Sequence, residues 1–162
     1  MRQLLVDYLP FEVKPEQIVE SMKENHGRLV VRGVLQRAEA KNQNGRVYPH
    51  AVLQKEVKNF NAKYVNEGRA LGELDHPDSS VVNLNNVSHN ILETWWESNT
   101  IMGKMEIIMS PGYISKGIIS CQGDNVANLI RKGVRLGVSS RGVGSLKKIH
   151  PWLNTDREII SV

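Results

Sequence analysis

Residues 134–146, Val-Arg-Leu-Gly-Val-Ser-Ser-Arg-Gly-Val-Gly-Ser-Leu, predict a β-strand that is rich in glycine. One face of such a strand is apolar and carries Val134, Leu136 and Val138, with Ser140 continuing it. The opposite face is polar and carries Arg135, Gly137, Ser139 and Arg141. Ser139 therefore stands beside a guanidinium, near glycines that let another backbone approach closely. A serine there can serve as a nucleophile, or can simply be a small polar residue on a glycine-rich strand.

The segments before and after this strand indicate a small α+β fold. Apolar and β-branched runs predict further strands at 28–38, 69–76, 87–96, 100–109 and 157–162. Helical spacing of apolar side chains predicts helices at 16–23, 49–66 and 126–132, the last capped by Asp124 or Asn125. A polar loop is expected at 77–85, and a loop rich in glycine and serine at 110–123. Because the elements follow no regular alternation, we expect a small, mostly antiparallel sheet or barrel flanked by helices.

The length and composition exclude several classes of protein. The chain has 162 residues, of which 40% are hydrophobic and 23% are charged, so it fits one globular domain rather than a disordered segment. No apolar run approaches the roughly 20 residues of a membrane span. Cys121 is the only cysteine, which excludes an internal disulfide and a cysteine-rich zinc site.

The net charge of +4 is concentrated in one stretch of the chain. Residues 125–150 contain no acid, and their basic residues are Arg131, Lys132, Arg135, Arg141, Lys147 and Lys148. A basic patch of this kind suits an acidic partner, either nucleic acid or a glutamate-rich protein segment. A solvated basic face is the alternative.

A second motif, Gly-Glu-Leu-Asp-His-Pro at residues 72–77, places a histidine at the end of a predicted strand. A histidine held by a following proline can act as the general base that a serine nucleophile requires. Glu73, Asp75 and Asp78 could instead join His76 around a hard metal ion, but no second histidine lies at ligand spacing. We therefore expect neither a metal nor a cofactor. A plain surface turn is the remaining alternative.

Two further segments complete the pattern. Residues 42–49 (NQNGRVYP) predict a turn that leads into a helix, with Arg46 and Tyr48 as candidates to line a cleft. Trp95 and Trp96 are adjacent in a predicted strand, so they face opposite sides of it.

Taken together, these segments resemble the prohead core proteases of T-even-type tailed phages. The segments that carry the resemblance are, in chain order, N-x-N-G-R-x-Y-P, A-L-G-E-L-D-H-P, W-W and G-V-S-S-R-G-x-G-S. Those proteases are similar in fold and in active-site order to assemblin, the herpesvirus maturation protease. The resemblance extends from about residue 28 to residue 146.

The resemblance implies a role for the two central motifs. His76 matches the family's catalytic histidine and Ser139 its nucleophile, with Ser140 as the second candidate. Main-chain N–H groups from Ser140 to Gly142 are the candidate oxyanion donors, supported by the charge of Arg141.

The third catalytic residue is left open. Assemblin uses a second histidine and the phage enzymes an acid, on a strand after the nucleophile. Asp75, Asp156 and His150 are the candidates within the chain, and we expect the acid to lie beyond Val162, which would make the chain a truncated form. Loss of the orienting group of a triad costs on the order of 10⁴ in turnover, so such a chain can be inactive as it stands.

The family implies a serine endopeptidase that cleaves scaffold, core and major capsid proteins after glutamate, in Leu/Ile-x-Glu segments. Arg135 or Arg141 is expected to bind that glutamate. Residues 1–27 are expected to be an N-terminal segment open to processing, with Glu20 in Ile-Val-Glu as the self-cleavage candidate. Residues 28–162 are expected to be the protease domain without its last strand.

Such an enzyme would act in the host cytoplasm, inside the assembling prohead, without a membrane. Self-association stays open, and nucleic acid is not expected as a substrate. The alternative is a non-catalytic basic module that binds scaffold protein or nucleic acid in the prohead. That alternative explains the charge, but it does not explain His76 and Ser139 in this order.

Overall fold

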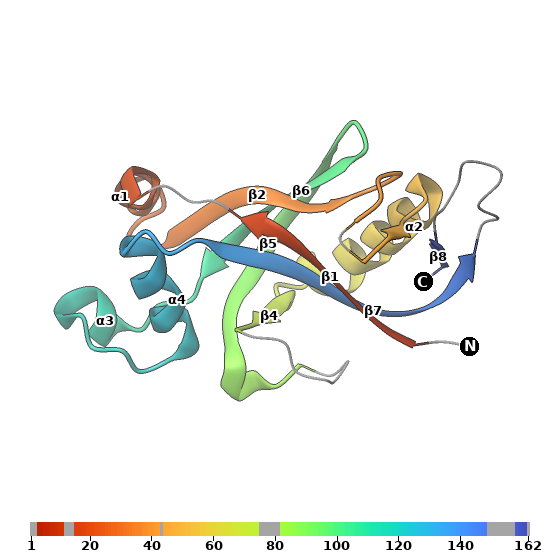
Figure 1. The fold of residues 1–162 in the computed structure, drawn as a ribbon. Coiled ribbons are helices and arrows are strands. Elements are labelled where there is room, and N and C mark those ends of the chain that lie inside the picture. Colours follow the sequence, from red (N-terminus) through yellow and green to blue (C-terminus); the bar gives the residue numbers. More distant parts are fainter. Residues whose placement is uncertain (1–2, 12–14, 43, 75–81, 149–157, 162) are drawn as a thin grey trace.

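The computed structural model describes residues 3–11, 15–42, 44–74, 82–148 and 158–161 (Figure 1). Its elements in chain order are β1 (Gln3–Phe11), α1 (Pro15–Glu24), β2 (Leu29–Arg37), β3 (Arg46–Val47), α2 (His50–Phe60), the π-helical turn η1 (Asn61–Val65), β4 (Leu71–Glu73), the 3₁₀ turn η2 (Leu84–Asn86), β5 (Val87–Glu97), β6 (Thr100–Ile107), α3 (Pro111–Lys116), α4 (Gln122–Arg131), β7 (Leu136–Lys148) and β8 (Glu158–Ser161). None of the helices in these ranges is both long and apolar enough to cross a lipid bilayer.

Two four-stranded sheets form the body of the fold. The first has the order β2-β6-β5-β4 and is antiparallel throughout. The second has the order β1-β7-β8-β3, in which β1 and β8 run antiparallel to β7 and the short β3 runs parallel to β8. The long β1–β7 pair crosses the first sheet, and α1, α3 and α4 gather near one end (Figure 1). The expected α+β class, with mostly antiparallel strands and flanking helices, is confirmed.

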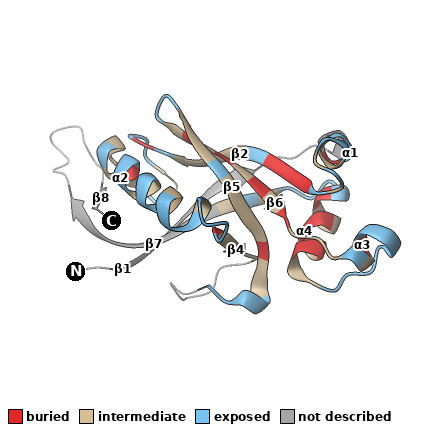
Figure 2. Cartoon of the chain, turned by 180° about the vertical axis from the view of Figure 1, so that it is seen from behind, coloured by how far each residue is buried: buried red, intermediate tan, exposed pale blue. Residues whose placement is uncertain are grey.

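The main core lies where the first sheet meets α1, α3 and α4, and Figure 2 shows the buried stretches of β2, β6 and α4 that contribute to it. Its buried side chains are Ile18, Leu29, Val31, Met105, Ile107, Tyr113, Val126, Ala127 and Ile130. Along β6 the buried residues alternate with half-buried ones, as expected for a strand with one face on a core. Side chains from β5 and β7 also pack against the main core, so it joins the two sheets.

A smaller cluster lies under α2 and accounts for the tryptophan pair. It consists of Ala38, Tyr48, Leu53 and Ile101, with Trp96 packed against it. Trp96 also stacks on the His50 ring at a centroid distance of 4.4 Å. Trp95 instead donates its Nε1–H to Glu97 Oε1 over 3.3 Å. The two adjacent tryptophans thus have different surroundings, as the alternation along a strand predicts.

Several predicted elements are confirmed with small changes of boundary. They are the strands β2, β7 and β8, the β5–β6 hairpin, and the helix that follows Pro49. Pro49 is the N-cap of α2, and the helix passes into the π-helical turn η1 before Gly68, whose φ of +70° favours glycine.

Three expectations about local structure are wrong. Residues 110–123 are not one loop, because Ser110 accepts a hydrogen bond from the Tyr113 N–H and caps α3. Asp124 and Asn125 do not cap α4. The N-cap is Cys121, and Asp124 lies at the third helical position of a capping box. The first residues were given no strand, yet β1 pairs with β7 along its whole length.

Asp124 is a fully buried carboxylate that connects α3 to α4. Its Oδ1 accepts from the Ser110 N–H over 2.7 Å, and its Oδ2 accepts from the Ser110 hydroxyl over 2.7 Å. Oδ2 also accepts from the main-chain N–H groups of Ser120 and Cys121 over 2.9 and 3.2 Å. Burial acts to raise the pKa of Asp124, but these hydrogen bonds outweigh it and hold the pKa far below its ordinary value.

Candidate active site

The motif at residues 72–77 begins in β4, at the edge of the first sheet. Gly72 lies opposite His89 of β5, and the His89 ring covers it so closely that a Cβ at Gly72 would lie 2.0 Å from His89 Nε2. No residue with a side chain fits there while the ring stays in place. The glycine of the motif is therefore explained by the histidine that packs on it.

Leu74 is the described residue of this motif that packs against the main core. It follows β4 directly, two residues before His76, and its half-buried side chain packs against the main core. Residues 75–81 lie outside the described residues, so the catalytic roles of His76 and Asp75 stay predictions. The described part of the motif fixes the point from which the chain leaves the sheet toward His76.

The second motif lies in β7, whose register with β1 sets Ser139 opposite Tyr8 and Ser140 opposite Asp7. Leu136 and Val138 pack against the main core, whereas Gly137 is exposed. This is the alternation expected for the start of the strand. The side chains from Ser139 onward lie outside the described part of the chain, so the choice between Ser139 and Ser140 stays a prediction.

The two motifs converge on one hydrophobic core. Leu74 precedes His76 by two residues and Val138 precedes Ser139 by one, and both side chains pack against the main core. The segments are about 60 residues apart in the sequence and belong to different sheets. Both segments therefore contribute an apolar side chain to the same core.

The other predicted site residues divide into three groups. Arg135 and Glu20 are described, and both are exposed, Arg135 just before β7 and Glu20 on α1. Arg141 and Gly142 lie in the stretch of β7 that is described only as main chain. Asp156 and His150 lie outside the described residues. The structure therefore places Arg135 one residue before the strand that carries the predicted nucleophile.

One serine–histidine hydrogen bond was missed by sequence reasoning. Ser88 Oγ and His89 Nδ1 are 2.8 Å apart on β5. Ser88 is only 1% exposed, so its hydroxyl cannot reach a substrate carbonyl. Burial also lowers the pKa of His89 and keeps the ring neutral near pH 7. This pair packs and fixes the β4–β5 edge, and it is not a second catalytic pair.

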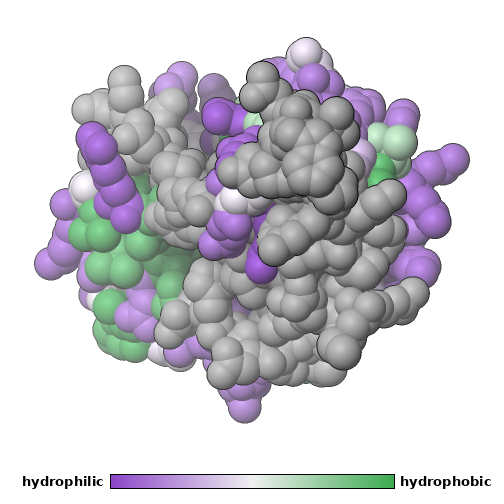
Figure 3. Space-filling model, turned by 45° about the vertical axis from the view of Figure 1, so that its right-hand side comes forward, coloured by the Kyte–Doolittle hydropathy of each residue, from purple (hydrophilic) through white to green (hydrophobic). Residues whose placement is uncertain are grey.

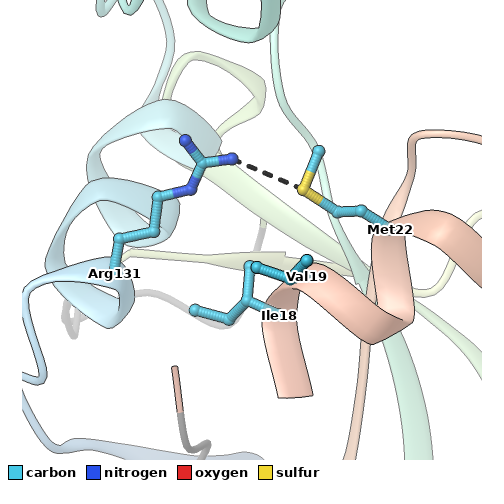
Figure 4. Close-up of a pocket in the computed structure, with 4 residues that line it drawn as sticks. All are labelled: Ile18, Val19, Met22 and Arg131. Atoms are coloured by element: carbon cyan, nitrogen blue, oxygen red, sulfur yellow. Dashed lines mark hydrogen bonds between the residues drawn. The ribbon is translucent and has the colours of Figure 1, made fainter. Parts of the chain in front are cut away.

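A groove between α1 and α4 is lined, among the described residues, by Ile18, Val19, Met22 and Arg131 (Figure 4). Arg131 donates from Nη2 to Met22 Sδ over 3.4 Å, and its guanidinium lies 5.3 Å from the centre of the Tyr113 ring. None of these described lining residues is a nucleophile or a general base. Apolar side chains also gather at one side of the surface in Figure 3. Exposed apolar side chains include Val19 on α1 and Ile114 on α3.

The metal alternative gains no support from the described residues. Within them, no three His, Cys, Asp or Glu side chains are close enough to hold an ion together. Glu73, which belonged to the predicted metal set, accepts a hydrogen bond from the Asn83 N–H over 3.0 Å. Its carboxylate thus serves the turn that leads into β5.

Comparison with known proteins agrees with the motif pattern. A family model described as prohead core protein serine protease matches residues 11–160. The chain is 36% identical over 118 residues to the prohead core protein protease of Enterobacteria phage T4, an alignment that covers 73% of this chain and 52% of that protein. It therefore spans about half the length of the curated relative. A solved structure of the bacteriophage T4 capsid assembly protease matches with a TM-score of 0.79 and 30% identity, over 99% of this chain and 90% of that chain. Since the family model covers far more than half of its length, the chain belongs to the family of prohead core protein serine proteases.

Proposed function

We propose that this chain is the protease domain of a serine endopeptidase that acts in the assembling prohead, with Ser139 as nucleophile and His76 as general base. Two findings support the proposal. The family model spans both motifs. The single structural observation behind it is that Leu74 and Val138, beside the two catalytic positions, pack against one core.

The proposed reaction is acyl transfer to serine followed by hydrolysis. Ser139 Oγ attacks the scissile carbonyl carbon while His76 accepts the hydroxyl proton and then passes it to the leaving amine. A water molecule, deprotonated by the same histidine, hydrolyses the acyl-enzyme and releases the second product. An acidic group oriented toward His76 would hold the ring in the productive tautomer, and Asp75 and Asp156 stay the candidates within the chain.

The sheet topology supports main-chain oxyanion donors near Ser139. Among the described strands, β1 pairs with one edge of β7, and β8 pairs with the other edge only from Ser145 to Lys148. The β8-side edge of β7 between residues 136 and 144 therefore carries no described strand. In an antiparallel ladder, alternate N–H groups point to each edge. The proposed oxyanion donors are the main-chain N–H groups between Ser140 and Gly142 that point to this edge, with Arg141 adding charge.

The proposed substrates are scaffold, core and capsid proteins, cut after glutamate. Arg135 is exposed just before β7, and with Arg141 it is the proposed partner for the substrate carboxylate. The proposed self-cleavage site, Glu20, is exposed on α1, but Ile18 two residues earlier is buried in the main core. Cleavage after Glu20 therefore requires α1 to unwind locally, which would couple removal of the N-terminal segment to a change in the core.

The test is cleavage of a peptide that contains Ile-x-Glu. We expect cleavage by the unaltered chain, loss with Ser139→Ala and with His76→Ala, and retention with Ser140→Ala. The Ser140→Ala variant is the matched control, because it removes the same hydroxyl one position along the strand. Activity that survives Ser139→Ala and is lost with Ser140→Ala would move the nucleophile by one residue. If the unaltered chain cleaves no such peptide, the same assay is repeated with a chain extended beyond Val162. Continued absence of cleavage would contradict the proposal.

The second candidate is a non-catalytic basic module of the prohead. The observation that favours it is the group of exposed cations at the junction of α4 and β7: Arg131, Lys132 and Arg135. Binding of nucleic acid through such a group would weaken steeply with added salt. Retained binding together with an absence of cleavage would favour this candidate over the protease.

A further inference from the structure

We propose that Asn86 is a positioning residue that fixes the main chain two residues before His76 and so sets where the general base stands. The inference rests on the proposed serine protease function and concerns the same site. Asn86 is the last residue of η2 and precedes β5 directly. Nothing in the sequence marks it, because it lies between the expected loop at 77–85 and the expected strand at 87–96.

Asn86 holds both polar groups of the Leu74 peptide unit. The Leu74 N–H donates to the Asn86 carbonyl oxygen over 3.0 Å. The Asn86 side-chain amide in turn donates from Nδ2 to the Leu74 carbonyl oxygen. Leu74 thus makes the two hydrogen bonds that a residue in a regular antiparallel ladder makes, although it lies past the end of β4.

The side-chain amide is needed because the ladder is irregular at this point. β4 and β5 pair Gly72 with His89 and Glu73 with Val87, so the register shifts by one residue between the two pairs. Beyond such a bulge, the partner strand no longer presents a main-chain N–H in the right place. The carboxamide of Asn86 supplies that donor, and neither an alanine nor an ionised aspartate could do so.

Asn86 is itself held in place by the turn around it. Its N–H donates to the Asn83 carbonyl oxygen over 2.9 Å, and the Asn83 side chain accepts from the Asn85 N–H over 3.1 Å. The Asn83 N–H donates to Glu73 Oε1, which ties the turn back to β4. Together with the His89 ring on Gly72 and the packing of Leu74 on the main core, these contacts make the exit of β4 a rigid support.

A rigid exit at Leu74 limits where the chain can place residue 76. Two residues span at most about 7 Å, so the position of Leu74 confines His76 to a small region around the exit of β4. General-base catalysis needs the ring nitrogen within hydrogen-bond reach of the serine hydroxyl. Misplacement by about 1 Å can cost on the order of 100-fold in rate. Loss of the Asn86 amide should therefore lower kcat much more than it changes KM.

The experiment compares Asn86→Ala and Asn86→Asp with Asn85→Ala in the peptide assay. Asn85 is the matched control, because it is the adjacent asparagine of the same turn and its side chain is exposed. We expect kcat to fall roughly 10- to 100-fold in both Asn86 variants, with KM within about twofold, and kcat to stay unchanged with Asn85→Ala. Melting temperatures and far-UV spectra show whether each variant is folded when its kcat is measured.

Hydrogen exchange followed by mass spectrometry gives a readout that does not depend on activity. The peptide that covers residues 74–78 should exchange faster in Asn86→Ala than in the unaltered chain, while peptides from β6 and α4 stay unchanged. A folded Asn86→Ala variant with full kcat, or with unchanged exchange at residues 74–78, would overturn the inference. If neither the unaltered chain nor a chain extended beyond Val162 cleaves a peptide, the proposed function fails, and the exchange comparison still decides whether Asn86 fixes this segment.

Discussion

Replacing Asp124 by asparagine tests how the α3–α4 end of the main core is held together. The substitution keeps the shape of the side chain but removes its charge and one of its two acceptor oxygens. Asp124 is 0% exposed, so water cannot replace the lost acceptor without opening the structure.

The cost follows from the number of donors. Oδ2 accepts from the Ser110 hydroxyl and from the N–H groups of Ser120 and Cys121, while Oδ1 accepts from the Ser110 N–H. If the asparagine oxygen takes the Oδ2 position, its NH₂ group faces the Ser110 N–H, and that donor loses its partner. An unpaired buried donor costs about 1–3 kcal/mol, and the remaining bonds weaken because they lose the charge. We expect a total loss of about 3 kcal/mol, a large share of the roughly 5–15 kcal/mol that stabilises a domain.

The same residue predicts a dependence of stability on pH. The pKa of Asp124 is lower in the folded chain than its ordinary value of 3.8, so the unfolded chain takes up the proton first. Its stabilising contribution is therefore complete above about pH 5 and is lost as the pH falls below 3.8. The difference in stability between the unaltered chain and Asp124→Asn should stay constant from pH 7 to pH 5 and shrink toward pH 3.

Urea unfolding at each pH measures both effects. With a slope of about 2 kcal/mol per molar urea, a loss of about 3 kcal/mol lowers the midpoint by roughly 1.5 M at pH 7. Glu93→Gln is the control, since it removes one carboxylate from an exposed position on β5. A loss of less than about 0.5 kcal/mol in Asp124→Asn, or a difference that does not shrink in acid, would refute the reasoning.

Three further predictions concern the glycines and the specificity of the site. Gly123→Ala should destabilise the chain by more than about 3 kcal/mol, because the new Cβ would lie 1.6 Å from the Ile108 carbonyl oxygen. The control, Gly112→Ala, should be nearly neutral, because no atom lies within 4 Å of its Cβ. Equal melting temperatures for the two variants would contradict this prediction. Gly72→Ala should displace the His89 ring and slow peptide cleavage. The double variant Gly72→Ala, His89→Ala should recover part of the melting temperature that Gly72→Ala loses. If the losses of melting temperature in the two single variants simply add in the double variant, the His89 ring is not what excludes a Cβ at position 72. Arg135→Ala should reduce the preference of the enzyme for glutamate over glutamine before the cut bond, measured as the ratio of kcat/KM for two matched peptides, and an unchanged ratio would remove Arg135 from the substrate site.

Two elements of the fold, β1 and α3, were not predicted from the sequence. No strand was expected before residue 28. The strand β1 contains Pro10 and lies at the edge of its sheet, where a proline is tolerated. The helix α3 was missed because glycine and serine dominate residues 110–123, although Ser110 followed by Pro111 is a recognisable helix start. The strands β2, β5 and β6 were predictable because apolar and β-branched residues run through them, and in β6 buried residues also alternate with half-buried ones.

For the site, sequence could predict the residue types but not what holds them. The family resemblance identified the two motifs in their order, and the family assignment is confirmed. The structure explains why residue 72 of the first motif is a glycine, because the His89 ring packs directly on it. Asn86 and the buried Ser88–His89 pair could not be found from sequence, because their roles depend on a register shift between two strands.

The central claim is that Ser139 is the nucleophile and that His76 activates it. Reaction with a fluorophosphonate, followed by mass spectrometry to locate the adduct, tests this claim most directly. We expect a single adduct on Ser139 that is retained in Ser140→Ala and lost in His76→Ala. An adduct on Ser140 or Ser88, an adduct whose yield does not depend on His76, or no adduct on the folded chain would contradict the account.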